Sequence, residues 1–270
     1  MREEIAFRRK PPHVVAHRGA SGHAPEATLA AYRLAIRMGV DFIELDVQMT
    51  RDGEIIVIHD SRVDRTTNGS GLVRELTLAE IRALDAGTWF NNQYPDKARP
   101  EFAGQQVPTV QEIIDLAGRA KVGLYVEIKN PQQYPPEFEQ EVVTAIQRNH
   151  FQQRVMLLSF DTFSLAKVKA LDPSIPTALL SSGDQPDPVA TAQSVHAGEL
   201  ALCHEILTHE IAIRARQKGL TLAAWTVDEK YGYQRLIGLE VDRIITNYPD
   251  RLLRLLGRGA VEKPKSQKGM

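Results

Sequence analysis

Short apolar runs alternate with longer amphipathic stretches along almost the whole chain. Strand-like runs occupy residues 13–16, 42–49, 124–128, 155–159, 177–180, 199–202, 222–227 and 243–246. Apolar residues recur at helical spacing over residues 28–38, 109–120, 137–148, 162–171, 208–218 and 230–236. This alternation predicts a parallel sheet with helical crossovers, and eight strands in about 250 residues favour a closed (β/α)8 barrel, the TIM barrel, over an open sheet.

One interval breaks this rhythm. Residues 61–107 are rich in Gly, Asn, Asp and Pro and contain one short helical patch at 78–84. The interval is too long for an ordinary loop between a strand and a helix, so we expect an insertion on one face of the barrel. An alternating run at 54–58 predicts a small extra strand just before it. We therefore expect one barrel domain over residues 1–257, an insertion at about 61–107, and a flexible tail at 258–270.

Composition narrows the class of protein. The 270 residues include 33 Lys and Arg, 34 Asp and Glu, 43% hydrophobic residues and one Cys. The hydrophobic content suffices for a full core, and the net charge of −1 offers no electrostatic basis for binding nucleic acid. One Cys excludes an intramolecular disulfide framework. Because the charged first residues precede no apolar signal region and no apolar run approaches about 20 residues, we expect a cytoplasmic protein without stable membrane insertion.

The strand at residues 42–49 carries acidic side chains on one face. Ile43, Leu45 and Val47 share the apolar face, whereas Glu44 and Asp46 share the other. In a barrel the apolar face meets the helices, so the two carboxylates point inward, where they repel each other and are costly to desolvate. A bound hard cation, Mg²⁺ or Ca²⁺, removes that cost. The alternative is a pair of salt-bridged acids at the barrel rim.

The strand at residues 124–128 repeats this arrangement. Glu127 and Lys129 alternate with apolar neighbours at the end of the strand. Glu127 would complete a site of three carboxylates, and Lys129 would meet an anionic oxygen of a substrate. On the pattern alone, the two side chains could equally pair with each other.

Two histidines directly follow apolar strands, where the active sites of barrel enzymes lie. His17 follows the first strand and His59 follows the short extra strand. A lone His at such a place is ordinarily a satisfied polar residue, but two of them near a carboxylate cluster favour paired acid–base chemistry. Arg18 offers two parallel donors to a phosphate, and Gly19 and Gly22 would let the backbone approach it.

At this point the chain resembles the glycerophosphodiester phosphodiesterase family, in its bacterial cytosolic type. The blocks that carry the resemblance follow the family's order over nearly the whole chain. They are His17-Arg18-Gly19 with Pro25-Glu26 and Thr28, Glu44-Leu45-Asp46-Val47 with Thr50 and Asp52-Gly53, His59-Asp60, Glu127-Ile128-Lys129, Trp225-Thr226-Val227, and Asp242 with Ile244-Ile245-Thr246. The resemblance implies a TIM barrel that hydrolyses glycerophosphodiesters, such as glycerophosphocholine or glycerophosphoethanolamine, to glycerol 3-phosphate and an alcohol with one divalent cation.

The resemblance also implies a role for each matching residue. The metal ligands would be Glu44, Asp46 and Glu127. The general acid and base would be His17 and His59, with His17 taken as the base. The residues that contact substrate would be Arg18 and Lys129 at the phosphate and Trp225 at the glycerol, with Glu26 supporting the site from behind. Attack by the neighbouring glycerol hydroxyl and direct attack by water both fit this arrangement.

The chain departs from the family pattern at Ala27, Arg243 and Asn247, which bears on substrate detail and on the geometry of the barrel mouth. Two other functions stay open on the residues. A lysophospholipase D-like enzyme would take lipid diesters, and an apolar patch formed by Trp89 and its neighbours on the insertion would favour it. A barrel that only binds a phosphodiester would lack an imidazole or a carboxylate, and none is missing. The head group, the choice between Mg²⁺ and Ca²⁺ and the oligomeric state stay open.

Overall fold

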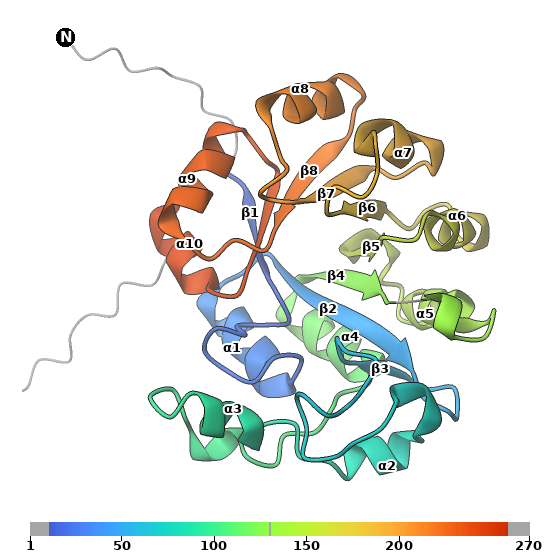
Figure 1. Cartoon of the computed structure of the whole chain (residues 1–270), viewed down its shortest axis with the longest axis vertical. Helices are drawn as coiled ribbons and strands as arrows, with labels where there is room; N and C mark the ends of the chain where they lie inside the picture. The colour runs from blue at the N-terminus through green and yellow to red at the C-terminus, as the bar shows by residue number, and fades with distance from the viewer. Residues whose placement is uncertain (1–10, 130, 259–270) are drawn as a thin grey trace, which may run out of the picture.

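Eight parallel strands form a closed barrel in the computed structural model, which describes residues 11–129 and 131–258 (Figure 1). The strands are β1 (His13–Ala16), β2 (Phe42–Met49), β4 (Gly123–Ile128), β5 (Val155–Ser159), β6 (Thr177–Ser181), β7 (Glu199–Cys203), β8 (Thr221–Trp225) and β9 (Arg243–Thr246). They pair in the order β1-β9-β8-β7-β6-β5-β4-β2, and pairing of β1 with β2 closes the ring. The predicted TIM barrel is confirmed.

The extra strand and the insertion also lie where the sequence predicts them. Strand β3 (Ile55–Val57) pairs antiparallel with β2. Before the next barrel helix the chain forms η1 (Val73–Glu75), α2 (Leu78–Arg82), α3 (Thr88–Gln93) and η2 (Pro100–Phe102). The limits of the domain and of the insertion stay a prediction.

Helices surround the barrel on its outside (Figure 1). They are α1 (Leu29–Met38), α4 (Val110–Ala120), α5 (Phe138–Arg148), α6 (Thr162–Leu171), α7 (Pro188–Ser194), α8 (His209–Gln217), α9 (Lys230–Gly238) and α10 (Pro249–Leu255). The six predicted helices are present, and the predicted first residues Thr28 and Thr109 are N-caps whose side chains accept a backbone N–H. The pattern did not predict α7 and α10, because each spans only seven residues.

The apolar side chains form an outer and an inner core. The outer core lies between strands and helices and includes Ile43, Leu45 and Val47 of β2. The inner core fills the barrel and includes Tyr125 and Leu158. The predicted alternation along β2 therefore holds, and it leaves the acidic residues of that strand on the side away from the helices.

One departure from the family pattern lies at the end of the barrel opposite to the one expected. Arg243 is the first residue of β9, level with His13, and it pairs with the buried carboxylate of Glu199 at the start of β7. Tyr125 and Thr221 donate hydrogen bonds to the same carboxylate, at 2.7 and 2.9 Å. Arg243 therefore does not shape the barrel mouth, because its side chain completes a buried ion pair where the strands begin.

The first residue of the predicted tail, Arg258, is held against the barrel. Its guanidinium pairs with the carboxylate of Asp41, with N–O distances of 2.7 and 2.9 Å. The rest of the predicted tail, residues 259–270, lies outside the described residues, as do residues 1–10 of the predicted domain. Within the described part of the chain, no helix has the length and apolar character needed to cross a membrane.

Candidate active site

The ends of β1, β2, β4 and β8 bring most of the predicted site residues around one cavity. The cavity has a volume of about 200 Å³. The predicted residues on its wall are His17, Arg18, Glu44, His59, Glu127, Lys129 and Trp225. Asp46 is 1% exposed and contacts Arg18 beside them. Two larger surface hollows, of about 670 and 400 Å³, contain none of these side chains, so we place the site in the smaller cavity.

Three carboxylates gather on neighbouring strands. Asp46 of β2 lies level with Glu127 of β4, and Glu44 lies one step below on the same face. Each offers an oxygen, and these oxygens lie within 4.8 Å of one another. Burial and the charge of Asp46 raise the pKa of Glu44 well above its usual value and raise that of Glu127 to about 8. A divalent cation would relieve this concentration of negative charge.

The buried carboxylate of Asp46 supplies a test of that fit. Neither of its oxygens accepts a hydrogen bond, although Arg18 Nε lies 3.2 Å and Lys129 Nζ 3.8 Å away as ion-pair partners. Carboxylate oxygens are the ligands that Mg²⁺ and Ca²⁺ prefer, so buried oxygens without hydrogen bonds suit a cation. The three acids could therefore hold a divalent cation.

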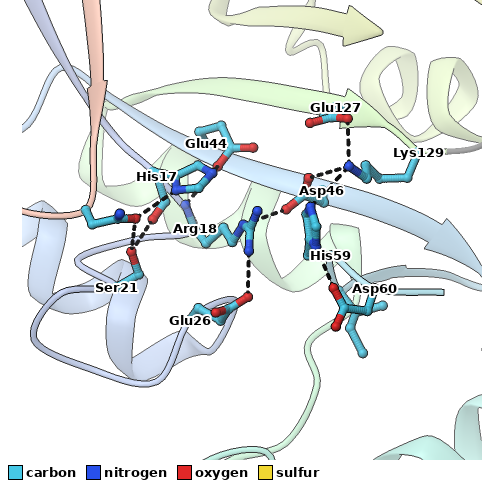
Figure 2. A network of polar contacts seen from close by, with 12 residues as sticks. His17, Arg18, Ser21, Glu26, Glu44, Asp46, His59, Asp60, Glu127 and Lys129 are labelled. Carbon is cyan, nitrogen blue, oxygen red and sulfur yellow. Dashed lines mark hydrogen bonds and ion pairs between the residues drawn. The ribbon is translucent and has the colours of Figure 1, made fainter. Parts of the chain in front are cut away.

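Two basic side chains border the acidic cluster (Figure 2). Arg18 has a left-handed backbone, with φ of 51°, and its N–H donates to Glu44 at 2.8 Å while its side chain extends to Asp46. Lys129 Nζ lies 3.0 Å from Glu127, so the pairing considered from the sequence is present. Lys129 also lines the cavity, where its ammonium can reach an anionic ligand.

The glycines of the loop after β1 allow this loop to pack closely against other parts of the protein. A Cβ at Gly19 would lie 2.6 Å from the backbone of Ala31, and one at Gly22 would lie 2.4 Å from the ring of Tyr248. Their absent side chains therefore allow the loop to pack against α1 and against the residue before α10. The approach of this backbone to a phosphate stays a prediction.

His17 is held by an amide from the far end of the chain. Asn247 follows β9, and its Oδ1 lies 2.8 Å from His17 Nδ1. The amide is oriented in turn, because Asn247 Nδ2 donates to Asp228 at 2.7 Å. Since the amide oxygen only accepts, Nδ1 of His17 carries the proton, and the unprotonated Nε2 lies 3.9 Å from a carboxylate oxygen of Glu44. Burial and the charge of Arg18 lower the pKa of His17 to about 4, so the ring is neutral at pH 7.

His59 has a charged partner instead. Its Nδ1 lies 2.6 Å from a carboxylate oxygen of Asp60, and its Nε2 lies 3.2 Å from Lys129 Nζ (Figure 2). Burial lowers the pKa of His59, while the charges of Asp46 and Asp60 act in the opposite direction. The two imidazoles therefore line one cavity but differ in the group behind them.

Part of the cavity wall is apolar. Trp225 and Phe160 meet edge to face with ring centroids 5.7 Å apart, and Leu158 lies beside them. Trp225 Nε1 donates to the backbone of Ala201 at 2.9 Å, which fixes the indole in place. The cavity therefore has both charged and apolar lining residues.

Sequence reasoning missed the groups that orient these side chains. Asn247 was noted only as a departure from the family pattern, and Asp228 was not singled out. Glu26, which was expected to support the site from behind, accepts a hydrogen bond from Arg18 Nη1 at 2.8 Å. The sequence does show polar residues after the strand ends. It does not show which side chain each of them contacts.

Comparison with known proteins agrees with this geometry. The profile of the Glycerophosphoryl diester phosphodiesterase family matches residues 17–251. A glycerophosphodiester phosphodiesterase of Bacillus subtilis is 40% identical over 87% of this chain and 83% of its own, and one of Caldanaerobacter subterraneus is 39% identical over 91% and 98%.

Solved structures show the same barrel. A phosphodiesterase of Oleispira antarctica, in complex with the product sn-glycerol-3-phosphate, superimposes with a TM-score of 0.84 at 28% identity, covering 92% of this chain and 97% of its own. A putative glycerophosphoryl diester phosphodiesterase of Silicibacter pomeroyi gives 0.83 at 29% identity, covering 93% and 96%. The chain therefore belongs to the glycerophosphodiester phosphodiesterase family and is a phosphoric diester hydrolase that releases glycerol 3-phosphate from glycerophosphodiesters.

Proposed function

We propose that this enzyme cleaves small water-soluble glycerophosphodiesters, such as glycerophosphocholine and glycerophosphoethanolamine, with His17 as base and His59 as acid. One observation carries the proposal: both imidazoles line the same cavity as the acidic cluster and two basic side chains. The relative from Oleispira antarctica, which holds sn-glycerol-3-phosphate, supports the assignment of the product.

The charged groups would hold the phosphate. Glu44, Asp46 and Glu127 would bind one Mg²⁺ or Ca²⁺, which when bound supplies positive charge that stabilises the phosphate oxygens in the transition state. Arg18 and Lys129 donate hydrogen bonds to the oxygens that remain. The apolar wall around Trp225 contacts the carbon atoms of the glycerol.

The partners of the histidines support these roles. His17 is neutral with an unprotonated Nε2, so it accepts the proton of the attacking hydroxyl, either that of the glycerol or that of water. His59 donates a proton to the departing alcohol oxygen, because the carboxylate of Asp60 stabilises the protonated imidazole. The two rings therefore differ in the group behind each, a neutral amide behind the proposed base and a carboxylate behind the proposed acid.

The insertion does not favour a lipid substrate. Phe90 is 1% exposed and packs with Phe102 and Ala31, and Trp89 and Tyr94 pack against this cluster. These aromatic side chains form a small core between the insertion and α1. The apolar patch expected of a lysophospholipase D-like enzyme is therefore not formed by them.

The test compares two substrates. Glycerophosphocholine and lysophosphatidylcholine are incubated with the protein, each with and without EDTA, and glycerol 3-phosphate and choline are measured. We expect glycerol 3-phosphate from the first substrate only, its loss with EDTA, and its return when Mg²⁺ or Ca²⁺ is added in excess. Choline released from the lysolipid alone would contradict the substrate class, and turnover unaffected by EDTA would contradict the role of the acidic cluster. No product from either substrate would favour the binding-only barrel.

A further inference from the structure

One guanidinium from the segment after β3 contacts two carboxylates that serve different parts of the site. Nη1 and Nη2 of Arg65 donate to the two oxygens of Glu26 at 2.9 and 2.8 Å. Nε and Nη2 of Arg65 donate to the two oxygens of Asp60 at 2.6 and 3.2 Å. A planar guanidinium with this double fork fixes both distance and orientation between the carboxylates, which a flexible ammonium would not do.

Each carboxylate has a second partner inside the site. Glu26 also accepts from Arg18 Nη1 at 2.8 Å, and Asp60 also accepts from His59 Nδ1 at 2.6 Å. Figure 2 shows Glu26 beneath Arg18 and Asp60 beneath His59, on the same side of both. A continuous chain of charged hydrogen bonds thus runs from Arg18 through Arg65 to His59.

We propose that Arg65 is a positioning residue that sets the phosphate-binding side chain and the acid histidine relative to each other. It touches neither substrate nor the acidic cluster, and it acts through Glu26 and Asp60. The roles of Arg18 and His59 in this proposal rest on the proposed function. Through Arg65 the insertion would thereby contribute to the reaction.

The electrostatics of the two carboxylates support this role. Burial would raise the pKa of Glu26, but hydrogen bonds from Arg65 and the charge of Arg18 outweigh it and hold the pKa at about 2. Burial acts likewise on Asp60, and hydrogen bonds from Arg65 and His59 hold its pKa at about 2. Both groups are therefore firmly charged acceptors. Without Arg65, Glu26 keeps Arg18 as a partner, whereas Asp60 keeps only the imidazole and can rotate.

The test begins with matched variants in the same segment. Arg65→Ala should lower kcat/KM for glycerophosphocholine by about 10- to 100-fold, the usual effect of losing a group that orients a functional side chain. Arg62→Ala is the control, because Arg62 is 53% exposed and pairs only with its neighbour Asp64 among the described ion pairs. We expect the control to stay within about twofold of wild type. Equal activity of both variants would overturn the proposal.

A rescue experiment separates positioning from simple stabilisation. Guanidinium ion added at millimolar concentration should restore part of the kcat of Arg65→Ala and none of that of Arg62→Ala, because it can occupy the vacated place between the carboxylates. Arg65→Lys, which keeps the charge without the double fork, should fall between wild type and Arg65→Ala. If Arg65→Ala does not fold, the lysine variant carries the test, and wild-type kcat/KM in it would overturn the proposal.

Double variants separate the effect of Arg65 through Asp60 from its effect through Glu26. In the Asp60→Asn background, Arg65→Ala should no longer lower kcat, because the path to the imidazole is already broken. In the Glu26→Gln background, Arg65→Ala should no longer raise KM. Coupling of this kind is expected only between residues that act through each other, so losses that simply multiply in both backgrounds would overturn the proposal.

One readout does not depend on turnover. The ¹⁵N spectrum of the imidazoles, assigned with His59→Ala, should show one Nδ1–H tautomer for His59 in the wild type and a mixture in Arg65→Ala. If the wild type releases no glycerol 3-phosphate, the proposed function fails, yet this spectrum still decides whether Arg65 positions the ring. An unchanged tautomer in Arg65→Ala would overturn the proposal.

Discussion

The two imidazoles of the site differ in the residue that contacts the Nδ1 atom of each ring. Asn247 presents a neutral oxygen to His17, and Asp60 presents a carboxylate to His59. Each acceptor fixes the tautomer, but a neutral oxygen stabilises the protonated ring less than a charged carboxylate does. The departure from the family pattern at Asn247 therefore bears directly on His17 and leaves the reaction class unchanged.

The roles of the two histidines can be separated by the choice of leaving group. His17→Ala and His59→Ala should each lower kcat for glycerophosphocholine by about 10²–10⁴, the range for losing general acid–base catalysis. With a nitrophenyl ester of glycerol phosphate, whose nitrophenolate departs without a proton, His59→Ala should recover most of its activity and His17→Ala should not. Steady-state kinetics on both substrates make the comparison. Recovery by His17→Ala instead would reverse the assignment.

At the scale of elements, the insertion is built from short pieces that need side-chain partners. Helix α3 spans six residues, and Asp85 lies just before it. The carboxylate of Asp85 accepts the backbone N–H groups of Gly87 and Thr88 at 2.8 and 2.9 Å. It also accepts the N–H of Gly104 at 3.0 Å, which ties the two ends of this part of the insertion together. Local capping thus replaces the long apolar face that such short helices lack.

Asp85 makes the stability of the protein depend on pH in a direction that can be predicted. Burial would raise its pKa, but hydrogen bonds from Thr88 and from backbone N–H groups lower the pKa from 3.8 to about 2. A lowered folded-state pKa contributes stability that is present above 3.8 and is lost as the pH falls through about 2. We expect the free energy of unfolding to fall less steeply between pH 4 and pH 2 in Asp85→Asn than in wild type.

Urea denaturation at several values of pH measures this slope. Asp96→Asn, which removes an exposed carboxylate of the same segment, is the control and should follow the wild-type slope. If the free energy of unfolding of Asp85→Asn falls with pH as steeply as that of wild type, the charged carboxylate contributes nothing to stability.

At the scale of the whole molecule, the barrel separates a charged functional end from a charged structural end. The site residues lie toward or just after the C-terminal ends of the strands, whereas Arg243 and Glu199 pair where the strands begin. Glu199 is fully buried, and Tyr125 and Thr221 complete its hydrogen bonds. The apolar inner core lies between the two ends. Substitutions at the end where the strands begin should therefore change the free energy of unfolding without changing the catalytic rate.

Arg243→Met tests this separation. It leaves the buried carboxylate of Glu199 without its cation, which should lower the free energy of unfolding by about 3–5 kcal/mol. The value of kcat at low temperature should stay near that of wild type. Arg254→Ala is the control, since Arg254 pairs with Asp250 at 67% exposure and should cost about 0–1 kcal/mol. Urea denaturation gives the stabilities, and a loss below about 1 kcal/mol for Arg243→Met, or a large fall in its kcat, would contradict the assignment.

The order of strands and helices, and with it the barrel, follows from the sequence alone. Alternation along β2 decides which side chains face the helices, and helical spacing places α1 and α4 to within one residue. These patterns are local, since each depends on neighbours a few residues apart. The barrel then brings the strand ends together, so the grouping of Glu44, Asp46 and Glu127 could be predicted as well.

Only the tertiary structure decided which partner stands behind each functional group. Asn247 meets His17 across 230 positions, and Arg65 joins Glu26 to Asp60 across 39 and 5. The same holds for Gly22, whose missing side chain makes room for Tyr248. No periodicity records such contacts, because they depend on the paths of loops and on packing between segments far apart in the chain. The sequence determined the barrel and the chemistry at its mouth, and the folded loops determined how each group there is oriented and charged.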